Sequence, residues 1–310
     1  MRPALPPGAG RDATPGPGAG PGIEVGIGDD AAVLATPDGR VVATTDFLIE
    51  GRHFRRDWAG PADIGHRAAV RSLADVAAMG AVPTALLVAL AAPSWLPSSW
   101  ALDLAAGLAA EAARAGATVA GGDTASFDAV LLAVTGLGDL QGRRPVTRDG
   151  ARPGDVLAVA GPLGHSAAGL ALLAAGRREP ALLIAAHLRP APPYDAGPEA
   201  ARLGATALMD VSDGLLADLG HIADASRVAI DVRTEALDPA PLLRAADALG
   251  AGRPLEWLLT GGEDHSLVAT FPAGTTLPPR WRVIGEVRPG RGVLVDGRPH
   301  AGPGGWQHFR

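Results

Sequence analysis

Acidic residues that lie beside glycine, or at the ends of apolar runs, recur along this chain and constrain its fold more than any other feature. Five segments carry the pattern: Gly26-Ile27-Gly28-Asp29-Asp30, Thr44-Thr45-Asp46, Gly121-Gly122-Asp123, Asp210-Val211-Ser212-Asp213-Gly214 and Gly261-Gly262-Glu263-Asp264. Carboxylates gathered at strand ends repel one another unless a positive charge lies among them, and several hard oxygen ligands suit Mg²⁺ better than a softer metal. The first hypothesis is therefore a metal-dependent enzyme that acts on phosphates.

Two amino acids that the chain lacks exclude common kinds of active site. It contains no lysine and no cysteine, and all 27 of its basic residues are arginines. Without lysine there is no Walker lysine, no protein-kinase strand lysine and no Schiff base. Without cysteine, thiol catalysis and disulfides are excluded as well. The codon bias of a GC-rich genome explains most of this composition, but the chemical exclusions stand whatever its cause.

Length, charge and hydropathy narrow the class of protein further. A chain of 310 residues is long enough for two domains, and its net charge of -6 argues against a general nucleic-acid binder. The longest uncharged apolar stretch, 81–96, contains Pro83 and Pro93 and is too short to span a bilayer. Residues 1–22 are rich in Pro and Gly and lack the apolar core of a signal peptide. We expect them to be a disordered lead-in to a cytoplasmic protein.

The first half of the chain is predicted to alternate strands and helices around the acidic turns. A strand over 41–45 delivers Asp46 at its C-terminal end, and a helix begins near Asp63, a plausible cap, and ends at Gly80. Asp75 lies near the C-terminal end of that helix, where its charge opposes the helix dipole unless a cation binds there. The remaining expected elements are a strand over 81–90, a helix from Ser98 or Ser99 to Gly116, a strand over 118–120 that leads into the second acidic turn, and a strand over 129–136.

The second half is expected to be a separate α/β domain. The stretch 138–154, rich in Arg, Gly and Pro, is the best candidate boundary. It divides the chain into a metal-binding, ATP-binding and dimerisation domain over 23–141 and a C-terminal domain over 148–310. The C-terminal elements that we predict are strands over 156–160 and 207–210, helices over 166–175 and 214–225, and short strands near 266–270, 282–285 and 293–295. The predicted fold class is thus α/β with mixed sheets.

For several segments a structural interpretation competes with a functional one. Glycine and aspartate dominate ordinary turns, so the segment that ends in Asp30 is a weak signal in isolation. The turn 161–164 before a helix is either a phosphate cradle or a simple tight turn. The turn 210–214 packs two carboxylates and a hydroxyl together, and the alternative is helix capping by Ser212 or Asp213.

Four further residues have the same ambiguity when each is taken alone. His53 lies among arginines and either meets an anionic substrate or is a solvated surface residue. Arg148 has the planar fork that suits a phosphate clamp, although most surface arginines clamp nothing. Trp306 is one of six tryptophans, most of which serve packing. Glu263 follows two glycines and fits an ordinary turn as well as a binding site.

Taken together and in order, these segments resemble the thiamine-monophosphate kinase family. The matching segments are Gly26-Ile27-Gly28-Asp29-Asp30-Ala31-Ala32, Thr44-Thr45-Asp46, Gly51-Arg52-His53-Phe54, Asp75-Val76-Ala77-Ala78-Met79-Gly80, Gly121-Gly122-Asp123-Thr124, Thr147-Arg148, His187-Leu188-Arg189-Pro190, Asp210-Val211-Ser212-Asp213-Gly214-Leu215 and Gly261-Gly262-Glu263-Asp264. Most are loose individually, but their order and spacing are highly specific.

The resemblance implies a fold, a reaction and a set of site residues. The fold is that of aminoimidazole ribonucleotide synthetase, with an N-terminal domain that makes a homodimer through its sheet and a C-terminal domain that closes over the nucleotide. The reaction is transfer of the γ-phosphoryl group of ATP to thiamine monophosphate, assisted by several Mg²⁺ ions. Because the acceptor phosphate is already ionised, we expect direct in-line transfer without a phosphoenzyme. The magnesium ligands implied are Asp30, Thr44, Thr45, Asp46, Asp75, Asp123, Asp210 and Asp213. The ATP contacts implied are Thr45, Gly122, Asp123, Arg148 and Ser212, and the contacts to thiamine monophosphate are His53, Glu263 and Trp306. The residues implied in catalysis are Asp30, Asp46, Asp75, Asp123, Asp210, Asp213 and Arg148.

The chain departs from the family pattern in two places, and two other functions compete with the main hypothesis. The helical N-terminal segment is replaced by a Pro- and Gly-rich one, and the usual Tyr-Glu after Glu263-Asp264 reads His265-Ser266. One alternative is a sibling enzyme that acts on a purine-pathway amide or on selenide, although the Cys or Sec and the lysine of the selenium enzyme are absent. The other is a non-catalytic homologue that binds ATP or metal, against which the intact carboxylates argue.

Overall fold

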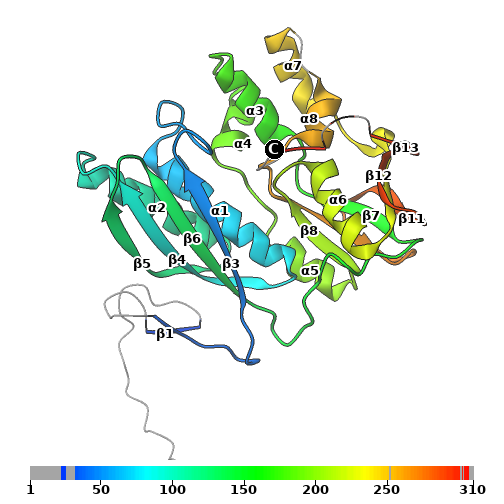
Figure 1. The fold of residues 1–310 in the computed structure, drawn as a ribbon, viewed down its shortest axis with the longest axis horizontal. Helices are drawn as coiled ribbons and strands as arrows, with labels where there is room; N and C mark the ends of the chain where they lie inside the picture. Colours follow the sequence, from blue (N-terminus) through cyan, green and yellow to red (C-terminus); the bar gives the residue numbers. More distant parts are fainter. Residues whose placement is uncertain (1–21, 26–31, 251–252, 301, 303, 307–310) are drawn as a thin grey trace, which may run out of the picture.

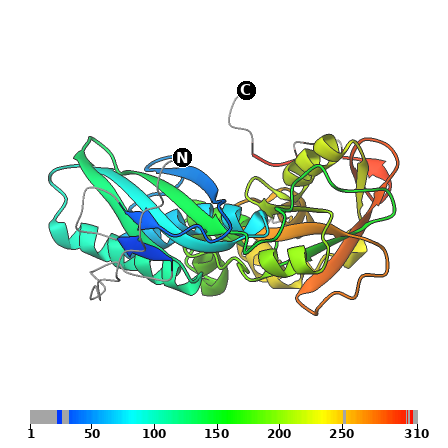
Figure 2. The same ribbon diagram turned by 90° about the horizontal axis from the view of Figure 1, so that it is seen from below.

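The computed structural model describes residues 22–25, 32–250, 253–300, 302 and 304–306. Asp30 and the rest of the first acidic segment, over 26–31, lie outside the described residues, as do residues 1–21 of the predicted lead-in. Figures 1 and 2 show two lobes that lie side by side, each built on its own sheet. Within the described part of the chain, no helix combines the length and the apolar character that crossing a membrane requires.

The N-terminal lobe is a four-stranded sheet with helices on one face (Figure 1). The strands lie in the order β3 (Val42–Ile49), β6 (Leu131–Asp139), β4 (Val82–Ala92) and β5 (Thr118–Ser126), with only the β4–β5 pair parallel. The covering helices are α1 (Pro61–Ala78) and α2 (Ser98–Arg114), and β1 (Ile23–Val25) pairs separately with β2 (Val33–Leu34). The two helices approach closely because Gly65 and Gly107 lack side chains: a Cβ on Gly65 would lie 2.0 Å from the Leu104 carbonyl oxygen.

Two predicted acidic turns in this lobe are instead continuous strand. The prediction that a strand ends at Asp46 was wrong, because β3 pairs with β6 from Val42 to Ile49 without interruption. The prediction of a turn at Gly121-Gly122-Asp123 was also wrong, since β5 runs through it and stays paired with β4 as far as Ser126. In both cases ladder hydrogen bonds to a neighbouring strand outweigh the local preference of glycine and aspartate for turns.

Helix α1 connects the two lobes. Pro61 is its first residue, and Asp63 lies at the third position, where its carboxylate accepts a hydrogen bond of 3.0 Å from the Gly60 N–H rather than capping the helix. Gly80, with φ of +73°, follows its end as predicted. The buried residues of α1, such as Leu73 and Ala77, belong to a hydrophobic core that also contains Leu208 of β8 and Phe271 of β10. The N-terminal helix is thus packed into the C-terminal lobe.

The C-terminal lobe is a mixed seven-stranded sheet surrounded by short helices. Its strand order is β13 (Arg298–Pro299), β12 (Gly292–Val295), β9 (Ala229–Val232), β11 (Trp281–Arg288), β7 (Val156–Ala160), β10 (Ser266–Phe271) and β8 (Ala207–Val211), and only the β9–β12 pair is parallel. The helices are α3 (His165–Ala174), α4 (Ala181–Leu188), α5 (Ala196–Arg202), α6 (Leu215–Ser226), η1 (Thr234–Ala236), η2 (Ala240–Leu242), α7 (Leu243–Leu249) and α8 (Pro254–Thr260). The strands and the two longer helices of this lobe begin and end within three residues of the predicted ranges, apart from β9 and β13, which were not predicted.

Candidate functional site

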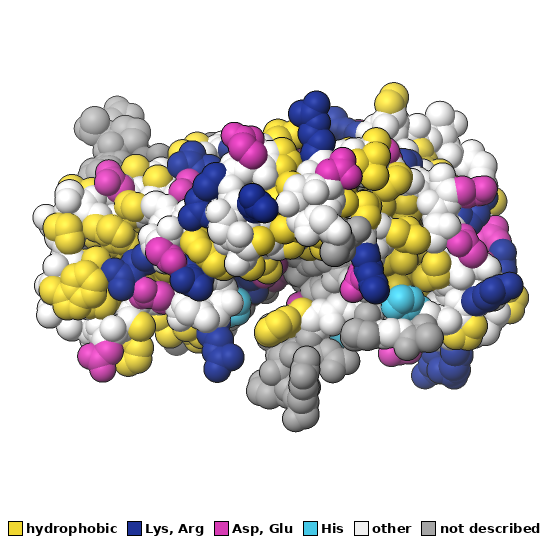
Figure 3. Space-filling model, turned by 90° about the horizontal axis from the view of Figure 1, so that it is seen from above, with side chains coloured by type: hydrophobic (Ala, Val, Ile, Leu, Met, Phe, Trp, Pro, Cys, Tyr) yellow, Lys and Arg dark blue, Asp and Glu magenta, His cyan; other side chains and the backbone are white. Residues whose placement is uncertain are grey.

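A cavity of about 550 Å³ lies where the two lobes meet. Its lining comes from the 51–59 loop, α1, the starts of α3 and α6, the end of α4, the 260–263 segment and residues 305–306. On the face drawn in Figure 3, arginine and acidic side chains are interspersed over both lobes, and the described residues form no broad basic surface there. On this face, arginine and acidic side chains are thus not divided into patches of one sign.

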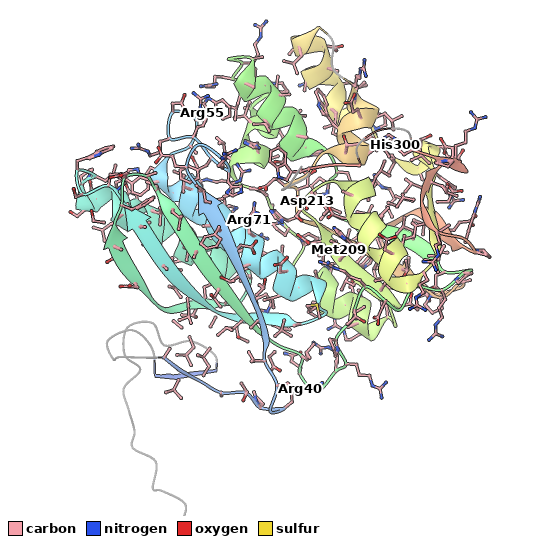
Figure 4. All side chains as sticks on the ribbon, viewed as in Figure 1. Arg40, Arg55, Arg71, Met209, Asp213 and His300 are labelled. Carbon is pink, nitrogen blue, oxygen red and sulfur yellow. The ribbon has the colours of Figure 1, made fainter. Side chains whose placement is uncertain are left out.

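One stripe of α1 supplies charged residues to this cavity. Asp63, Arg67, Arg71 and Asp75 follow one another at intervals of four residues, which places them along one face of a helix. Arg67 and Arg71 line the cavity, with side chains only 6% and 12% exposed. Figure 4 shows Arg71 at the junction of the two lobes. The stripe thus presents two cations followed by a carboxylate.

The two arginines hold Glu263, which was predicted to contact the substrate. Arg67 Nη2 donates to Glu263 Oε2 at 2.9 Å, and Arg71 Nη1 donates to Glu263 Oε1 at 2.5 Å. Burial by itself would raise the pKa of this carboxyl, but the two guanidinium charges hold the pKa well below its usual range. Glu263 is therefore a fixed anion on the wall of the cavity.

A buried histidine orients Arg67. Arg67 Nη1 lies 3.2 Å from His187 Nε2, and Ser166 Oγ lies 3.0 Å from His187 Nδ1. Because a guanidinium only donates hydrogen bonds, Nε2 accepts, so the proton of the neutral ring is on Nδ1 and is donated to Ser166. Burial, reinforced by the charge of Arg67, lowers the pKa of His187 to about 3. The ring is neutral at physiological pH.

Five aspartates form what we call the carboxylate cluster: Asp46, Asp75, Asp210, Asp213 and Asp218. Asp75 Oδ2 accepts a hydrogen bond of 2.7 Å from Thr44 Oγ1. Burial, followed by the charges of Asp210 and Asp46, raises the pKa of Asp75 to about 7. Burial and the charges of Asp210 and Asp213 raise the pKa of Asp218 to about 8. The cluster therefore contains more negative charge than its surroundings balance.

His265 lies between this cluster and Glu263. Its ring is buried, with Nδ1 3.1 Å from Asp210 Oδ2 and Nε2 4.0 Å from Glu263 Oε2. Burial would lower the pKa of His265, but the hydrogen bond and charge of Asp210 raise it. The backbone here adopts left-handed conformations, with φ of +65° at Glu263 and +53° at His265, which only a small share of non-glycine residues adopt.

The N-termini of α3 and α6 are already occupied by carboxylates of the chain itself. Asp264 accepts hydrogen bonds from Gly164 N at 2.5 Å and Ser166 N at 2.7 Å, and burial raises the pKa of Asp264 to about 7. The turn 161–164 is therefore a tight turn closed by Asp264 rather than a free phosphate cradle. Asp218 Oδ2 likewise accepts from the Asp213 and Gly214 N–H groups at 3.1 and 3.0 Å, so neither Ser212 nor Asp213 caps α6.

The structure places the remaining predicted site residues in two groups. His53, Ser212, Asp213 and Trp306 line the cavity with Glu263. His53 is held in place because its Nδ1 accepts a hydrogen bond of 3.0 Å from the backbone N–H of Ile49. The backbone N–H of Trp306 donates a hydrogen bond of 2.9 Å to the Asp213 carbonyl. The side chain of Trp306 is 65% exposed, so it lies at the mouth of the cavity.

The second group does not line the cavity. Thr45 lies on the face of β3 opposite to Thr44 and Asp46, with its hydroxyl bonded to the Val134 carbonyl and Thr135. Asp123, beside Gly122, is exposed on β5, which is separated from β3 by two strands, or about 14 Å across the sheet at the usual strand spacing. Arg148 is exposed, and its carbonyl accepts a hydrogen bond from Ser226.

Several residues of the site were not predicted from the sequence. Arg67, Arg71, His265 and Asp218 were not proposed for any role, and His187 was noted only as part of a matching segment. The four-residue spacing that links Arg67 and Arg71 to Asp75 was a readable signal. The contacts of His265 and Asp218 depend on tertiary packing and had no comparable signal.

The donor atoms of the carboxylate cluster suit Mg²⁺. They are all carboxylate or hydroxyl oxygens, and burial together with the charges of Asp210 and Asp46 raises the pKa of the Asp75 carboxyl, which a bound cation would offset. Among the described residues, no three His, Cys, Asp or Glu side chains are placed to hold a metal ion by themselves. That agrees with the usual coordination of Mg²⁺, by one or two carboxylates together with water and substrate phosphates.

Comparison with known proteins identifies the family. The model of the family described as AIR synthase related protein, N-terminal domain, matches residues 28–140, and that of the C-terminal domain matches residues 152–296. The chain is 50% identical to thiamine-monophosphate kinase of Mycobacterium tuberculosis, over 93% of this chain and 86% of that protein. The chain belongs to the thiamine-monophosphate kinase family. A relative from Corynebacterium glutamicum with the same name is 41% identical, over 91% of this chain and 88% of that protein.

The fold of this family member agrees with solved structures. A structure described as AaThiL complexed with AMPPCP and TMP matches with a TM-score of 0.82 and 36% identity, covering 91% of this chain and 92% of that one. Hydrogenase maturation protein HypE in complex with ATP matches with a TM-score of 0.71 at 22% identity, which shows the shared fold alone. The predicted family and the predicted two-domain fold class are thus confirmed.

Proposed function

We propose that this protein transfers the γ-phosphoryl group of ATP to the phosphate of thiamine monophosphate, which gives thiamine diphosphate and ADP. The observation that carries the proposal is a single cavity with a fixed anion, Glu263, on one wall and the carboxylate cluster beside it. The AaThiL structure that this chain resembles contains AMPPCP and TMP. The two ligands of AaThiL are therefore bound by a protein whose fold is closely similar to that of this chain.

Three cavity residues suit the thiamine part of the acceptor. Thiamine is cationic, and Glu263 provides a negative charge whose position is set by Arg67 and Arg71. Trp306, exposed at the cavity mouth, offers an aromatic face to a cationic ring. His53 lies on the same lining and supplies a polar contact whose orientation is fixed by Ile49 N. We assign these three residues to acceptor binding.

We assign Mg²⁺ to the carboxylate cluster. Asp46, Asp75, Asp210 and Asp213, with the Thr44 hydroxyl, would hold the ions together with substrate phosphates. When bound, the ions neutralise the charge of the two polyanions and align them for in-line displacement. Asp30 lies outside the described residues, and its assignment as a ligand stays a prediction.

The protein's own residues need only position the reactants. The acceptor phosphate is already ionised at neutral pH, so its attacking oxygen requires no strong general base. Direct transfer through a loose transition state depends mainly on alignment and neutralisation of charge. We therefore assign no aspartate as a nucleophile.

We also propose that the protein is a cytoplasmic homodimer. Gly122 and Asp123 lie on the exposed strand β5, and Thr45 faces away from the helices. Two strands separate Asp123 from Asp46 in one chain. A second copy packed against this sheet would complete an ATP site that the lobe of one chain does not form. Thr45, Gly122, Asp123 and Arg148 would belong to that site. The two domains would be those predicted, over 23–141 and 148–310.

The direct test is turnover by purified protein. Incubation with ATP, Mg²⁺ and thiamine monophosphate is expected to give thiamine diphosphate and ADP in equal amounts, measured by chromatography. Omission of the acceptor or addition of a chelator is expected to stop both products. ATP and acceptor binding without any thiamine diphosphate would instead support a non-catalytic homologue, and ADP without thiamine diphosphate would support another reaction of the superfamily.

A further inference from the structure

Arg71 lies between the acceptor pocket and the carboxylate cluster. Its Nη1 donates to Glu263 Oε1 at 2.5 Å, and its Nε is 3.9 Å from Asp46 Oδ1. Both Arg71 and Asp213 line the cavity, and Figure 4 shows them at the boundary between the lobes. One guanidinium thus spans the two parts of the site.

Arg71 has unused hydrogen-bonding capacity in this position. Within the described part of the chain it makes one hydrogen bond, to Glu263, although a guanidinium carries five N–H donors. Its Nε is buried without a hydrogen-bond partner, as is the Nε of Arg67, but Arg71 differs in having only one of its terminal nitrogens hydrogen-bonded within the described residues. Buried donors in native proteins are nearly always satisfied, so an open donor beside a ligand cavity calls for a ligand.

Arg67 offers an informative contrast four residues earlier on the same helix. Both of its terminal nitrogens are occupied, one by Glu263 and the other by His187. His187 is itself oriented by Ser166. Arg67 is therefore committed to holding Glu263, and a single carboxylate does not require a second full positive charge. Arg71, by contrast, keeps N–H donors that no described residue accepts, and these are available to another anion.

The position of Arg71 matches the phosphate of the acceptor. An acceptor whose cationic thiazolium lies near Glu263 and whose phosphate reaches the carboxylate cluster would bring its phosphate close to Arg71, because Arg71 contacts one side and approaches the other. A phosphate brought near Asp46, Asp75 and Asp210 would be repelled without a cation. The planar fork of arginine suits bidentate binding of phosphate oxygens.

We propose that Arg71 binds the phosphate of thiamine monophosphate and so distinguishes the phosphorylated acceptor from free thiamine. This inference rests on the proposed function. In the acceptor complex the guanidinium turns its open N–H groups to the phosphate while Arg67 keeps Glu263 in place.

The test compares two ligands that differ only in the phosphate. Binding of thiamine monophosphate and of thiamine is measured by calorimetry, without ATP, for the wild-type protein and for Arg71→Ala, Arg71→Lys and Arg67→Ala. We expect Arg71→Ala to weaken thiamine monophosphate about 10- to 100-fold, the range for a charge-assisted contact, and thiamine less than about 3-fold. Arg71→Lys should restore part of the lost affinity, because it returns the charge without the fork. Arg67→Ala should weaken both ligands alike.

Further arms separate failure of the inference from failure of the function. Arg40→Ala removes an exposed arginine that pairs with Asp38 and lies away from the cavity (Figure 4), and it should change neither affinity. Equal weakening of both ligands by Arg71→Ala would make Arg71 a structural support for Glu263, and unchanged affinity would show that it does not touch the phosphate. Either result overturns the inference even if the wild-type protein makes thiamine diphosphate. A wild-type protein that makes none overturns the proposed function itself.

Discussion

Glu263 and Asp75 lie on two sides of one site and are both half-buried carboxyls, yet their ionisation differs sharply. Glu263 lies between Arg67 and Arg71, which hold the pKa of its carboxyl far below the usual range. Asp75 lies near Asp210 and Asp46, and burial together with those charges raises its pKa to about 7. Burial acts in the same direction on both, so the neighbouring charges decide the result. The acceptor pocket is balanced in charge, whereas the carboxylate cluster requires a cation from outside.

Neutralising one member of the carboxylate cluster should have the largest effect on activity. We expect Asp75→Asn to reduce turnover about 10³-fold, because it removes a charge on which metal and phosphate alignment depends. The amide keeps its size and can still accept the Thr44 hydrogen bond. Since the substitution relieves repulsion from Asp210 and Asp46, the free energy of unfolding of the metal-free protein at pH 8 should rise, by about 2 kcal/mol.

Steady-state kinetics and urea unfolding in the presence of a chelator measure these two effects. A loss of stability together with activity would show that Asp75 is a structural residue and that the cluster is balanced after all. Activity within tenfold of the wild-type value would remove Asp75 from the metal site.

Neutralising the acceptor pocket should have the opposite effect on stability. Glu263→Gln leaves Arg67 without a counter-charge and leaves Arg71 with only the more distant Asp46, so the free energy of unfolding should fall by about 3 kcal/mol. Glu256→Gln is a matched control, because Glu256 pairs with Arg253 on the exposed surface and should contribute less than about 0.5 kcal/mol. Chemical denaturation of both variants checks the difference. Equal changes in the two variants would argue against a charge-balanced pocket.

The neutral His187 gives the acceptor pocket its own dependence on pH. Its pKa of about 3 lies below the unfolded value of about 6.5, so below pH 6.5 the unfolded chain takes up a proton that the folded protein does not. Stability from His187 is therefore complete above pH 6.5 and is lost as the pH falls, by about 2 kcal/mol at pH 5. His187→Gln keeps an acceptor for Arg67 and removes the titration.

Urea unfolding of both proteins at pH 5, 6 and 7 isolates this contribution. The wild-type protein should lose about 2 kcal/mol more than His187→Gln between pH 7 and pH 5. The raised pKa values of the carboxylate cluster have the opposite sign but are common to both proteins, so they cancel in the difference. Parallel curves would show that His187 is not held neutral.

Elements bounded by Pro or Gly were predicted well, whereas the two strands that continue through acidic segments, β3 and β5, were predicted to end too early. Helix α1 begins at Pro61 and ends before Gly80, and such local signals are present in the sequence itself. The strand through Gly121-Gly122-Asp123 depends on hydrogen bonds to β4, about 30 residues away in sequence, and no local signal reports it. The acidic residues that line the cavity were recognised because glycines and apolar runs mark them.

Their partners were missed for a similar reason. The contact between Arg71 and Glu263 joins residues almost two hundred positions apart, and only the folded chain brings them together. A family resemblance transfers positions that carry a motif, and neither Arg67 nor Arg71 belongs to one of the matching segments. The spacing of Arg67, Arg71 and Asp75 on α1 was available, but it became meaningful only once Glu263 was placed opposite.

The smallest expected effect tests which face of β3 belongs to the carboxylate cluster. Thr44→Val removes the hydrogen bond of 2.7 Å to Asp75 and should lower turnover about 10-fold. Thr45→Val changes a neighbouring residue whose side chain lies on the other face, where the proposed homodimer would place it against ATP, so it should raise the KM for ATP and leave kcat within about twofold. Both variants replace threonine with valine on the same strand, so the ratio of their kcat values measures how much more the hydroxyl on the inner face contributes to turnover than the hydroxyl on the outer face. A larger fall in kcat with Thr45→Val than with Thr44→Val would show that the outer face also contributes to phosphoryl transfer, and that the cluster defined by Asp75 is only part of the metal site.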